Sequence, residues 1–466
     1  MGTVREDKAV SSSTLMLRFA AVIALSFAPS VKPAPFPHTA LKRSEPAKDS
    51  KLATPPKQIS LWFTAKPQLA FTRISLDGPA GHIALDTVVA DTGNALHAHV
   101  PVLLVGGAYT IHWQTASADG HVIRGDIPFS ITGSSAIDTA VRPPPAVASP
   151  EEHHHDEPAT QPVMQRASEY RSVRWFEFAA MLAILGVLGF RHAVLPPLAV
   201  RGVLTSDAAD RARRLGRIAI VVYLAAAIVR LVVETIAMHG SGEFFGSAVS
   251  MLAHTTWGIG WILGAIGAVL LFVGWTVPRR IANVIGTPLA LTGAMGIVVA
   301  PALSGHAAAS NWFVPSVTLD ALHIAAAGLW IGGLLVVATV GIPAMRRLEG
   351  NPDGAVRALF SSFHPLALFC APLVVVAGLA TSWMRIGSLA GLRTSYGRIL
   401  LVKLGFFIVV AGIGAYNATR GRRKLGTPEG TVRMRRTASV ELLLAALVLV
   451  ATTFLIVSPV PIEMTP

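Results

Sequence analysis

Two residues in the first third of the chain, Asp119 and His121, have the chemistry and the spacing of metal ligands. They stand two positions apart in the run WQTASADGHVIRG, so on an extended strand both side chains leave from the same face. A carboxylate and an imidazole presented together suit a borderline divalent metal such as Cu(II). The structural alternative is a turn in which Asp119 accepts hydrogen bonds from nearby backbone amides.

A second group of candidate ligands lies at the ends of apolar segments farther along the chain. His254, His306 and His323 all fall near one surface of the expected membrane region, and Met251 and Met384 lie at a similar depth. Imidazole and thioether groups together suit copper, and the softer thioether favours Cu(I). Histidines at an interface also occur without any function, so a structural role is the alternative for each of them.

The composition is that of a membrane protein, with 52% hydrophobic and only 14% charged residues among 466. The net charge of +13 does not require a nucleic-acid partner, because the arginines lie mostly in short loops between apolar runs, where they set topology. Cys370 is the single cysteine, which excludes an intrachain disulfide and a CxxC metal motif.

Residues 1–37 have the features of an export signal. Arg5, Lys8 and Arg18 precede the apolar run FAAVIALSFA, which is short for a spanning helix. Two cleavage sites remain open, one after Ala28, which ends a small-x-small sequence, and one directly before His38.

Residues 38–132 have the pattern of a small all-β domain. Short apolar or alternating runs such as ISLWF, RISLDG and IPFSIT are separated by Gly, Pro, Asp and Asn, which is typical of a β-sandwich or barrel. We interpret the other histidines of this domain as solvated strand residues, with an auxiliary metal site as the alternative; they are His82, His97, His99 and His112. Residues 133–172 are expected to be a flexible linker, whose tract His153–His155 is either a loose metal trap or a polar patch.

Residues 173–466 predict an all-α membrane bundle of eight spans, each near the ~20 residues needed to cross a bilayer. The apolar segments centre on Trp175–Pro197, Ile218–Met238, Ser250–Val273, Val284–Ser304, Val317–Ile342, Phe363–Ile386, Leu400–Asn417 and Ser439–Val457. Every second loop is rich in arginine, whereas the loops HGSGEFF and SGHAAASNWFVP carry no Lys or Arg. The basic loops are therefore expected in the cytoplasm, with the β-domain and the C-terminus on the periplasmic side of an inner membrane.

Several charged residues lie inside the expected spans, among them two on one span and two near the ends of later spans. Arg230 and Glu234 are four positions apart on one helix face, and we expect them to pair with each other. Lys403 and Glu441 lie near the ends of their spans, where their side chains are expected to reach the interface.

Three segments of the β-domain resemble the periplasmic copper-binding CopC family. They are HTALKRSEPA, GGAYTIHWQTASADGHVIRG and IPFSIT. The resemblance implies a cupredoxin-like β-sandwich that binds Cu(II) through the equivalents of His38, Asp119 and His121. In that family the N-terminal amine also contributes, which here would require cleavage directly before His38.

The membrane region resembles the copper-resistance CopD family. The similarity rests on LDALHIAAAGLWIGGL, on YGRILLVKLG, and on Asn417 and Glu441 beyond them. Together the two parts are similar to CopC–CopD fusion proteins. This resemblance implies a role in copper uptake across the bacterial inner membrane.

The sequence therefore predicts a copper-uptake protein rather than an enzyme. The β-domain would capture Cu(II) and pass copper to His254, His306 and His323 in a bundle surrounded by lipid, with a periplasmic copper chaperone or reductant as a further partner. No GxxxxGK[ST] motif is present to drive transport with ATP. The alternatives are a membrane redox protein with b-type haem, which leaves no local motif, and a copper-delivery or assembly factor that transports nothing.

Overall fold

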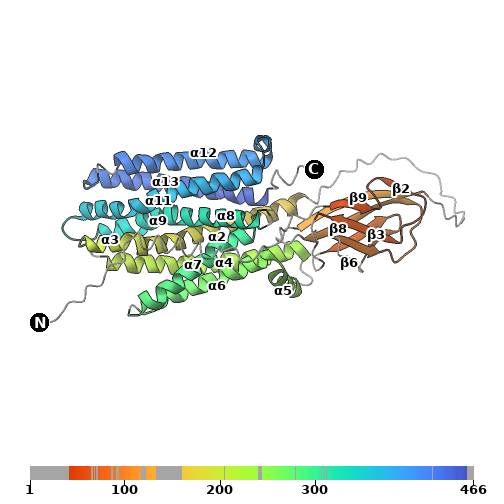
Figure 1. The fold of residues 1–466 in the computed structure, drawn as a ribbon, viewed down its shortest axis with the longest axis horizontal. Coiled ribbons are helices and arrows are strands. Elements are labelled where there is room, and N and C mark those ends of the chain that lie inside the picture. The colour runs from red at the N-terminus through yellow and green to blue at the C-terminus, as the bar shows by residue number, and fades with distance from the viewer. Residues whose placement is uncertain are drawn as a thin grey trace, which may run out of the picture. The chain divides into compact units, whose positions relative to one another are not determined.

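The computed structural model describes residues 41–132 and 160–458, apart from gaps at 65–66, 68, 70–71, 86–87, 91–93, 117–121, 204, 240–243, 279, 306, 309, 311, 422 and 424. The described residues form a β-sandwich near the N-terminus and a bundle of long helices after it (Figure 1). This is the fold class that the sequence predicts, an all-β domain followed by an all-α membrane region.

The sandwich consists of two sheets. The first has the strand order β1-β3-β7-β6 and is antiparallel; its strands are β1 (Leu41–Glu45), β3 (Gln58–Phe63), β7 (Ala95–His99) and β6 (Val88–Ala90). The second has the order β2-β9-β8-β4-β5, with β2 parallel to β9; its strands are β2 (Ser50–Leu52), β9 (Val122–Ile131), β8 (Gly107–Ala116), β4 (Arg73–Gly78) and β5 (Gly81–Ala84).

Alternating side chains of the two sheets form one apolar core. Leu61, Leu76, Leu96 and Ile111 are fully buried in it, and Trp113 stacks edge-on against Phe63. Because side chains alternate along a strand, the residues between these core positions point outward, and they are mostly polar. The sandwich thus has a core of its own within residues 41–132.

The helical region consists of α-helices and short π-helical or 3₁₀ segments (η), joined by turns and loops. Its elements are α2 (Thr160–Gly189), η2 (Phe190–Val194), α3 (Leu195–Val200), α4 (Ser206–His239), α5 (Phe244–His254), α6 (Thr256–Thr276), η3 (Ala282–Gly286), α7 (Thr287–Leu303), α8 (Phe313–Ala327), η4 (Gly328–Gly332), α9 (Gly333–Val336), η5 (Val337–Gly341), α10 (Ile342–Met345), α11 (Pro352–Ile386), η6 (Leu389–Arg393), α12 (Ser395–Tyr416), η7 (Asn417–Gly421) and α13 (Pro428–Val457).

Eight helical segments of the described chain are long and apolar enough to cross a membrane, in agreement with the eight predicted spans. They are Glu169–Val200, Ser206–Ile236, Thr256–Thr276, Ala282–Leu303, Phe313–Met345, Pro352–Ile386, Ser395–Gly421 and Pro428–Val457. Several of the predicted spans are shorter than the observed helices, because these helices extend beyond their apolar stretch into polar turns.

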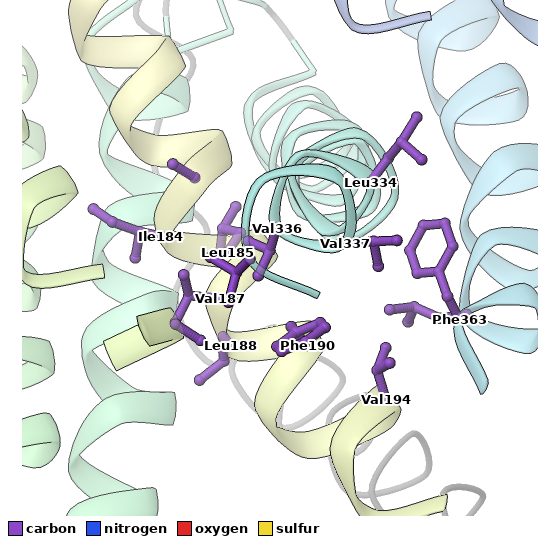
Figure 2. Packing of buried hydrophobic residues seen from close by; sticks show 14 of the residues in the cluster. Ile184, Leu185, Val187, Leu188, Phe190, Val194, Leu334, Val336, Val337 and Phe363 are labelled. Atoms are coloured by element: carbon purple, nitrogen blue, oxygen red, sulfur yellow. The ribbon is translucent and has the colours of Figure 1, made fainter. Parts of the chain in front are cut away.

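The helices α2 and η4 cross at very short distance. A Cβ atom added to Gly332 would overlap the carbonyl of Leu182, and one added to Gly186 would overlap the backbone of Gly332. The two backbones can approach this far only because both positions are glycine. Figure 2 shows part of the apolar cluster around this crossing, to which α2, η2, η5 and α11 contribute the buried side chains of Leu185, Phe190, Val337 and Phe363.

Candidate functional site

The predicted Cu(II) ligands of the β-domain lie outside the described residues. Asp119 and His121 belong to the segment that connects β8 to β9, and His38 precedes β1; the tract His153–His155 is also outside. The pairing of β8 with β9 is described up to Ala116 and Val122, directly beside the connecting segment. The three-ligand set therefore stays a prediction.

On the exposed face of the five-stranded sheet, two histidines and two aspartates form a hydrogen-bonded row. His82 Nδ1 lies 2.5 Å from Asp77 Oδ1, and His112 contacts both Asp77 (3.1 Å) and Asp126 (2.7 Å). These hydrogen bonds, with that from His82 the largest cause, hold the pKa of Asp77 below its usual value. Among the described residues, no three His, Cys, Asp or Glu side chains converge as a metal site would require, so this row is a solvated surface feature.

His323 is the candidate ligand of the membrane region whose surroundings the structure describes best. It lies on α8, and its Nδ1 is 3.0 Å from the backbone carbonyl oxygen of Val374 on α11. Because a carbonyl can only accept, Nδ1 carries the hydrogen, and in the neutral ring Nε2 then offers a lone pair. Nε2 has no hydrogen-bond partner within the described part of the chain. A backbone carbonyl that orients an imidazole through its other nitrogen is the usual support of a metal-binding histidine.

A glycine allows this contact. A Cβ atom on Gly378 of α11 would lie 2.9 Å from Cε1 and 3.0 Å from Nδ1 of His323. These distances are closer than side chains tolerate, so any other residue at position 378 would push the ring away from Val374.

Polar groups continue from His323 toward the end of the bundle at which α8 begins. Ser316, Asp320 and His323 are spaced by four and three residues, which places them on one face of α8. Asp320 forms a 2.5 Å ion pair with Arg385 of α11, and the Ser316 hydroxyl lies 3.9 Å from the sulfur of Met384. The face of α8 that packs on α11 is therefore polar over two helical turns.

Lys403 of α12 adds a further positive charge to this region. Its charge acts on His323, as do those of Arg385 and Asp320. Since Asp320 and Arg385 neutralise each other, Lys403 sets the sign of the local potential. The expectation that the Lys403 side chain reaches the interface is met only partly, because the side chain is half-buried in the bundle.

The other two predicted membrane ligands are less defined. His254 is the last residue of α5, and its side chain is exposed, whereas His306 lies outside the described residues. The three-histidine cluster therefore stays a prediction. Within the described chain, His323 is its only member with a half-buried side chain oriented by a hydrogen bond.

A buried ion cluster that the sequence did not predict joins α2 to α4. Glu177 accepts from Arg174 (2.7 Å) and from Arg230 (3.2 Å), and Arg230 also lies over the ring of Trp257. The predicted pairing of Arg230 with Glu234 is wrong, because helix spacing identifies partners within one helix only and Glu177 is 53 residues away. The outward polar position expected for Glu441 is also wrong, since this carboxyl group is buried.

Comparison with known families assigns three segments of the chain. Residues 41–132 match the CopC domain, residues 167–312 match the copper resistance protein D-like N-terminal domain, and residues 357–455 match copper resistance protein D. The chain joins a CopC domain to a CopD membrane region. The CopC domain is the β-sandwich. The two copper resistance protein D segments lie before and after α8 in the sequence, so His323 falls between them.

Individual relatives agree with this assignment. The copper transport protein CutJ of Bacillus subtilis (strain 168) is 25% identical over 481 residues, which cover 96% of this chain and 78% of that protein. The protein YobA of Escherichia coli (strain K12) is 26% identical over 126 residues, which cover 26% of this chain and 99% of that protein.

Solved structures match the CopC part. CopC from Methylosinus trichosporium OB3b is 23% identical and covers 22% of this chain and 100% of that chain, with a TM-score of 0.20. The methionine-rich copper resistance protein PcoC from Escherichia coli is 25% identical and covers 20% of this chain and 99% of that chain, with a TM-score of 0.19.

Proposed function

We propose that this protein takes up copper across a bacterial inner membrane, with copper as its substrate. Its CopC domain captures Cu(II) through Asp119, His121 and His38, and its CopD region carries copper through the bundle. The single observation that supports the membrane step best is His323, a half-buried imidazole whose Nδ1 is held by the carbonyl oxygen of Val374 and whose Nε2 is left for a ligand. The family assignment and the similarity to the copper transport protein CutJ support the choice of copper.

The oxidation state is proposed to change between the two parts. Oxygen and nitrogen ligands in the CopC domain favour Cu(II), whereas imidazole and thioether groups in the bundle favour Cu(I). One electron per copper ion is then required, and a periplasmic reductant supplies it. The positive charge of Lys403 beside His323 keeps binding of a copper cation weak, which suits a site that must release its ion.

Replacement of His323 by Ala tests the assignment. Cells that express H323A are expected to accumulate several-fold less copper than wild-type cells at equal membrane insertion, because the proposed ligand is lost. Thr318→Ala is the matched control on the same helix, since the Thr318 hydroxyl bonds only to Val314 of its own helix. Equal copper accumulation in H323A and wild type would show that His323 carries no copper.

Elemental analysis of the purified full-length protein separates copper handling from haem binding. Copper without iron is the expected result. Iron near one atom per chain would favour the redox alternative, in which the histidines of the bundle bind haem iron.

A further inference from the structure

The CopD region holds a second functional candidate at Glu441, far along the chain from the histidines. Glu441 lies on α13 with 3% of its surface exposed. It follows the exposed Arg436 by five residues, which is about 7.5 Å along a helix. The carboxyl group is therefore more than one helical turn inside the bundle from the basic end of α13.

The polar surroundings of Glu441 consist of one amide. Asn417 Nδ2 donates to Glu441 Oε1 at 2.5 Å, and within the described residues the carboxyl group has no other hydrogen bond and no ion pair. The neighbouring elements α9 and η5 carry no ionisable residue. The other ionisable residues of α11, α12, η7 and α13 do not pair with it; they are Asp353, Arg357, His364, Cys370, Arg385, Tyr396, Arg398, Lys403, Tyr416, Arg420, Glu429, Arg433, Arg435 and Arg436.

Because no cationic side chain of the described residues pairs with Glu441, a bound cation must compensate its charge when it is ionised. A buried carboxylate is strongly disfavoured unless a positive charge compensates it, and ionisable residues inside membrane spans mark ion or proton pathways. A metal ion would need further ligands, and the described residues offer no group of three His, Cys, Asp or Glu. A proton needs none, because it bonds covalently to the carboxylate oxygen.

Trp330, which lies on the same helix as His323, borders Glu441. Trp330 follows His323 by seven residues on the α8–η4 helix and stacks edge-on against Phe407 of α12. A Cβ atom on Gly414 would lie 3.5 Å from the Trp330 ring and 3.7 Å from Glu441 Oε2, so ring and carboxyl group border the same small space. Asn417 begins the π-helical segment η7, a type of segment that is frequent at functional sites.

We propose that Glu441 binds a proton and that this proton is exchanged for copper during transport; the exchange step rests on the proposed function. The charges of Asp320, Arg385, Lys403 and ionised Glu441 sum to zero. Either a proton on Glu441 or a Cu(I) ion on His323 raises the sum to +1, and both together raise it to +2. Like charges repel more strongly inside a membrane protein than in water, so each cation disfavours the other. One proton then leaves as one Cu(I) enters, and net charge is conserved.

Infrared spectroscopy tests the proton site without any transport assay. Difference spectra of the full-length protein in liposomes, recorded over a neutral to alkaline range in which exposed carboxyl groups stay ionised, are expected to contain a carbonyl band of a protonated carboxylic acid. The band is expected to be lost in Glu441→Gln, and to shift but remain in Asn417→Leu, which removes the hydrogen-bond donor. Glu234→Gln is the control, because Glu234 is a half-buried carboxyl of another helix. Absence of the band in wild type, or its persistence in E441Q, would overturn the proposal.

Copper flux tests the exchange. With Cu(I) kept reduced by ascorbate outside, an acidic liposome interior is expected to accelerate wild-type uptake several-fold and E441Q uptake not at all. Equal acceleration in both proteins would reject the exchange while leaving copper transport intact. If neither protein carries copper but E441Q alone lacks the infrared band, the proposed transport fails and the proton site stands.

Discussion

At the scale of single residues, the imidazole of His323 depends on a glycine. Gly378→Ala would place a methyl group 2.9 Å from Cε1 of the ring, which must then move away from Val374. The lost hydrogen bond is worth about 1 kcal/mol, so copper uptake at limiting copper is expected to fall about fivefold. The copper content of cells that express the wild type and G378A at equal levels measures this decrease. Gly405→Ala is the control, since nothing lies within 4 Å of a Cβ atom there; a G378A protein as active as G405A would contradict the role of Val374.

The hydrogen-bonded row of histidines and aspartates on the CopC domain predicts how the stability of this domain changes in acid. The pKa of Asp77 is lowered by its hydrogen bonds to His82 and His112, so the folded domain prefers the ionised form. This contribution to stability is complete above the ordinary value of 3.8 and is lost as the pH falls through the lowered value. The melting temperature of the isolated domain is expected to fall in this acid range, and to fall less in Asp77→Asn and in His82→Ala. If the melting temperatures of the wild type and both variants fell equally with pH, the contribution of Asp77 to stability would be contradicted.

At the scale of elements, the sequence predicted the spans well and their contacts poorly. Hydropathy over ~20 residues is a local property, so all eight spans were found from apolar runs. The partner of Arg230 depends instead on how α2 packs against α4, and the fit of Gly378 to His323 depends on how α11 packs against α8. Nothing in the spacing along the chain encodes either pairing, because many helix arrangements satisfy the same apolar pattern.

The buried ion cluster around Glu177 allows the packing of α2 against α4 to be tested by mutation. Glu177→Gln leaves the guanidinium groups of Arg174 and Arg230 without their shared carboxylate, and removal of one member of a buried pair costs about 3–5 kcal/mol. A clear drop in the melting temperature of the detergent-purified protein is expected. Asp207→Asn is the control, because it breaks the exposed pair with Arg211, which contributes at most about 1 kcal/mol. Equal melting temperatures of the two variants would mean that the cluster does not hold α2 to α4.

At the scale of the whole molecule, the order of the two parts was predictable because each part is contiguous and has its own pattern. The alternating runs of residues 38–132 and the long apolar runs after residue 173 predict a β-domain and a bundle independently of any family resemblance. The Cu(II) ligand set came from the resemblance to the CopC family instead. Spacing alone identified Asp119 and His121 but gave no reason to add His38.

Joining the CopC domain to the bundle predicts a specific dependence on copper concentration. A tethered binding domain raises the local concentration of its ligand, an effect that reaches 10²- to 10⁴-fold in linked systems. In-frame removal of residues 41–132 is therefore expected to raise the copper concentration for half-maximal uptake at least about tenfold. The maximal rate is expected to stay unchanged, because saturating copper reaches the bundle without help.

The same dependence should follow from the predicted ligands alone. Full-length protein with Asp119→Ala and His121→Ala is expected to reproduce the uptake curve of the deletion, because a domain that cannot hold Cu(II) adds no local concentration. Uptake rates over a range of copper concentrations at equal expression measure both proteins. A lower maximal rate in the deletion but not in the double variant would mean that the domain acts on the bundle as a folded body, independently of the metal it binds.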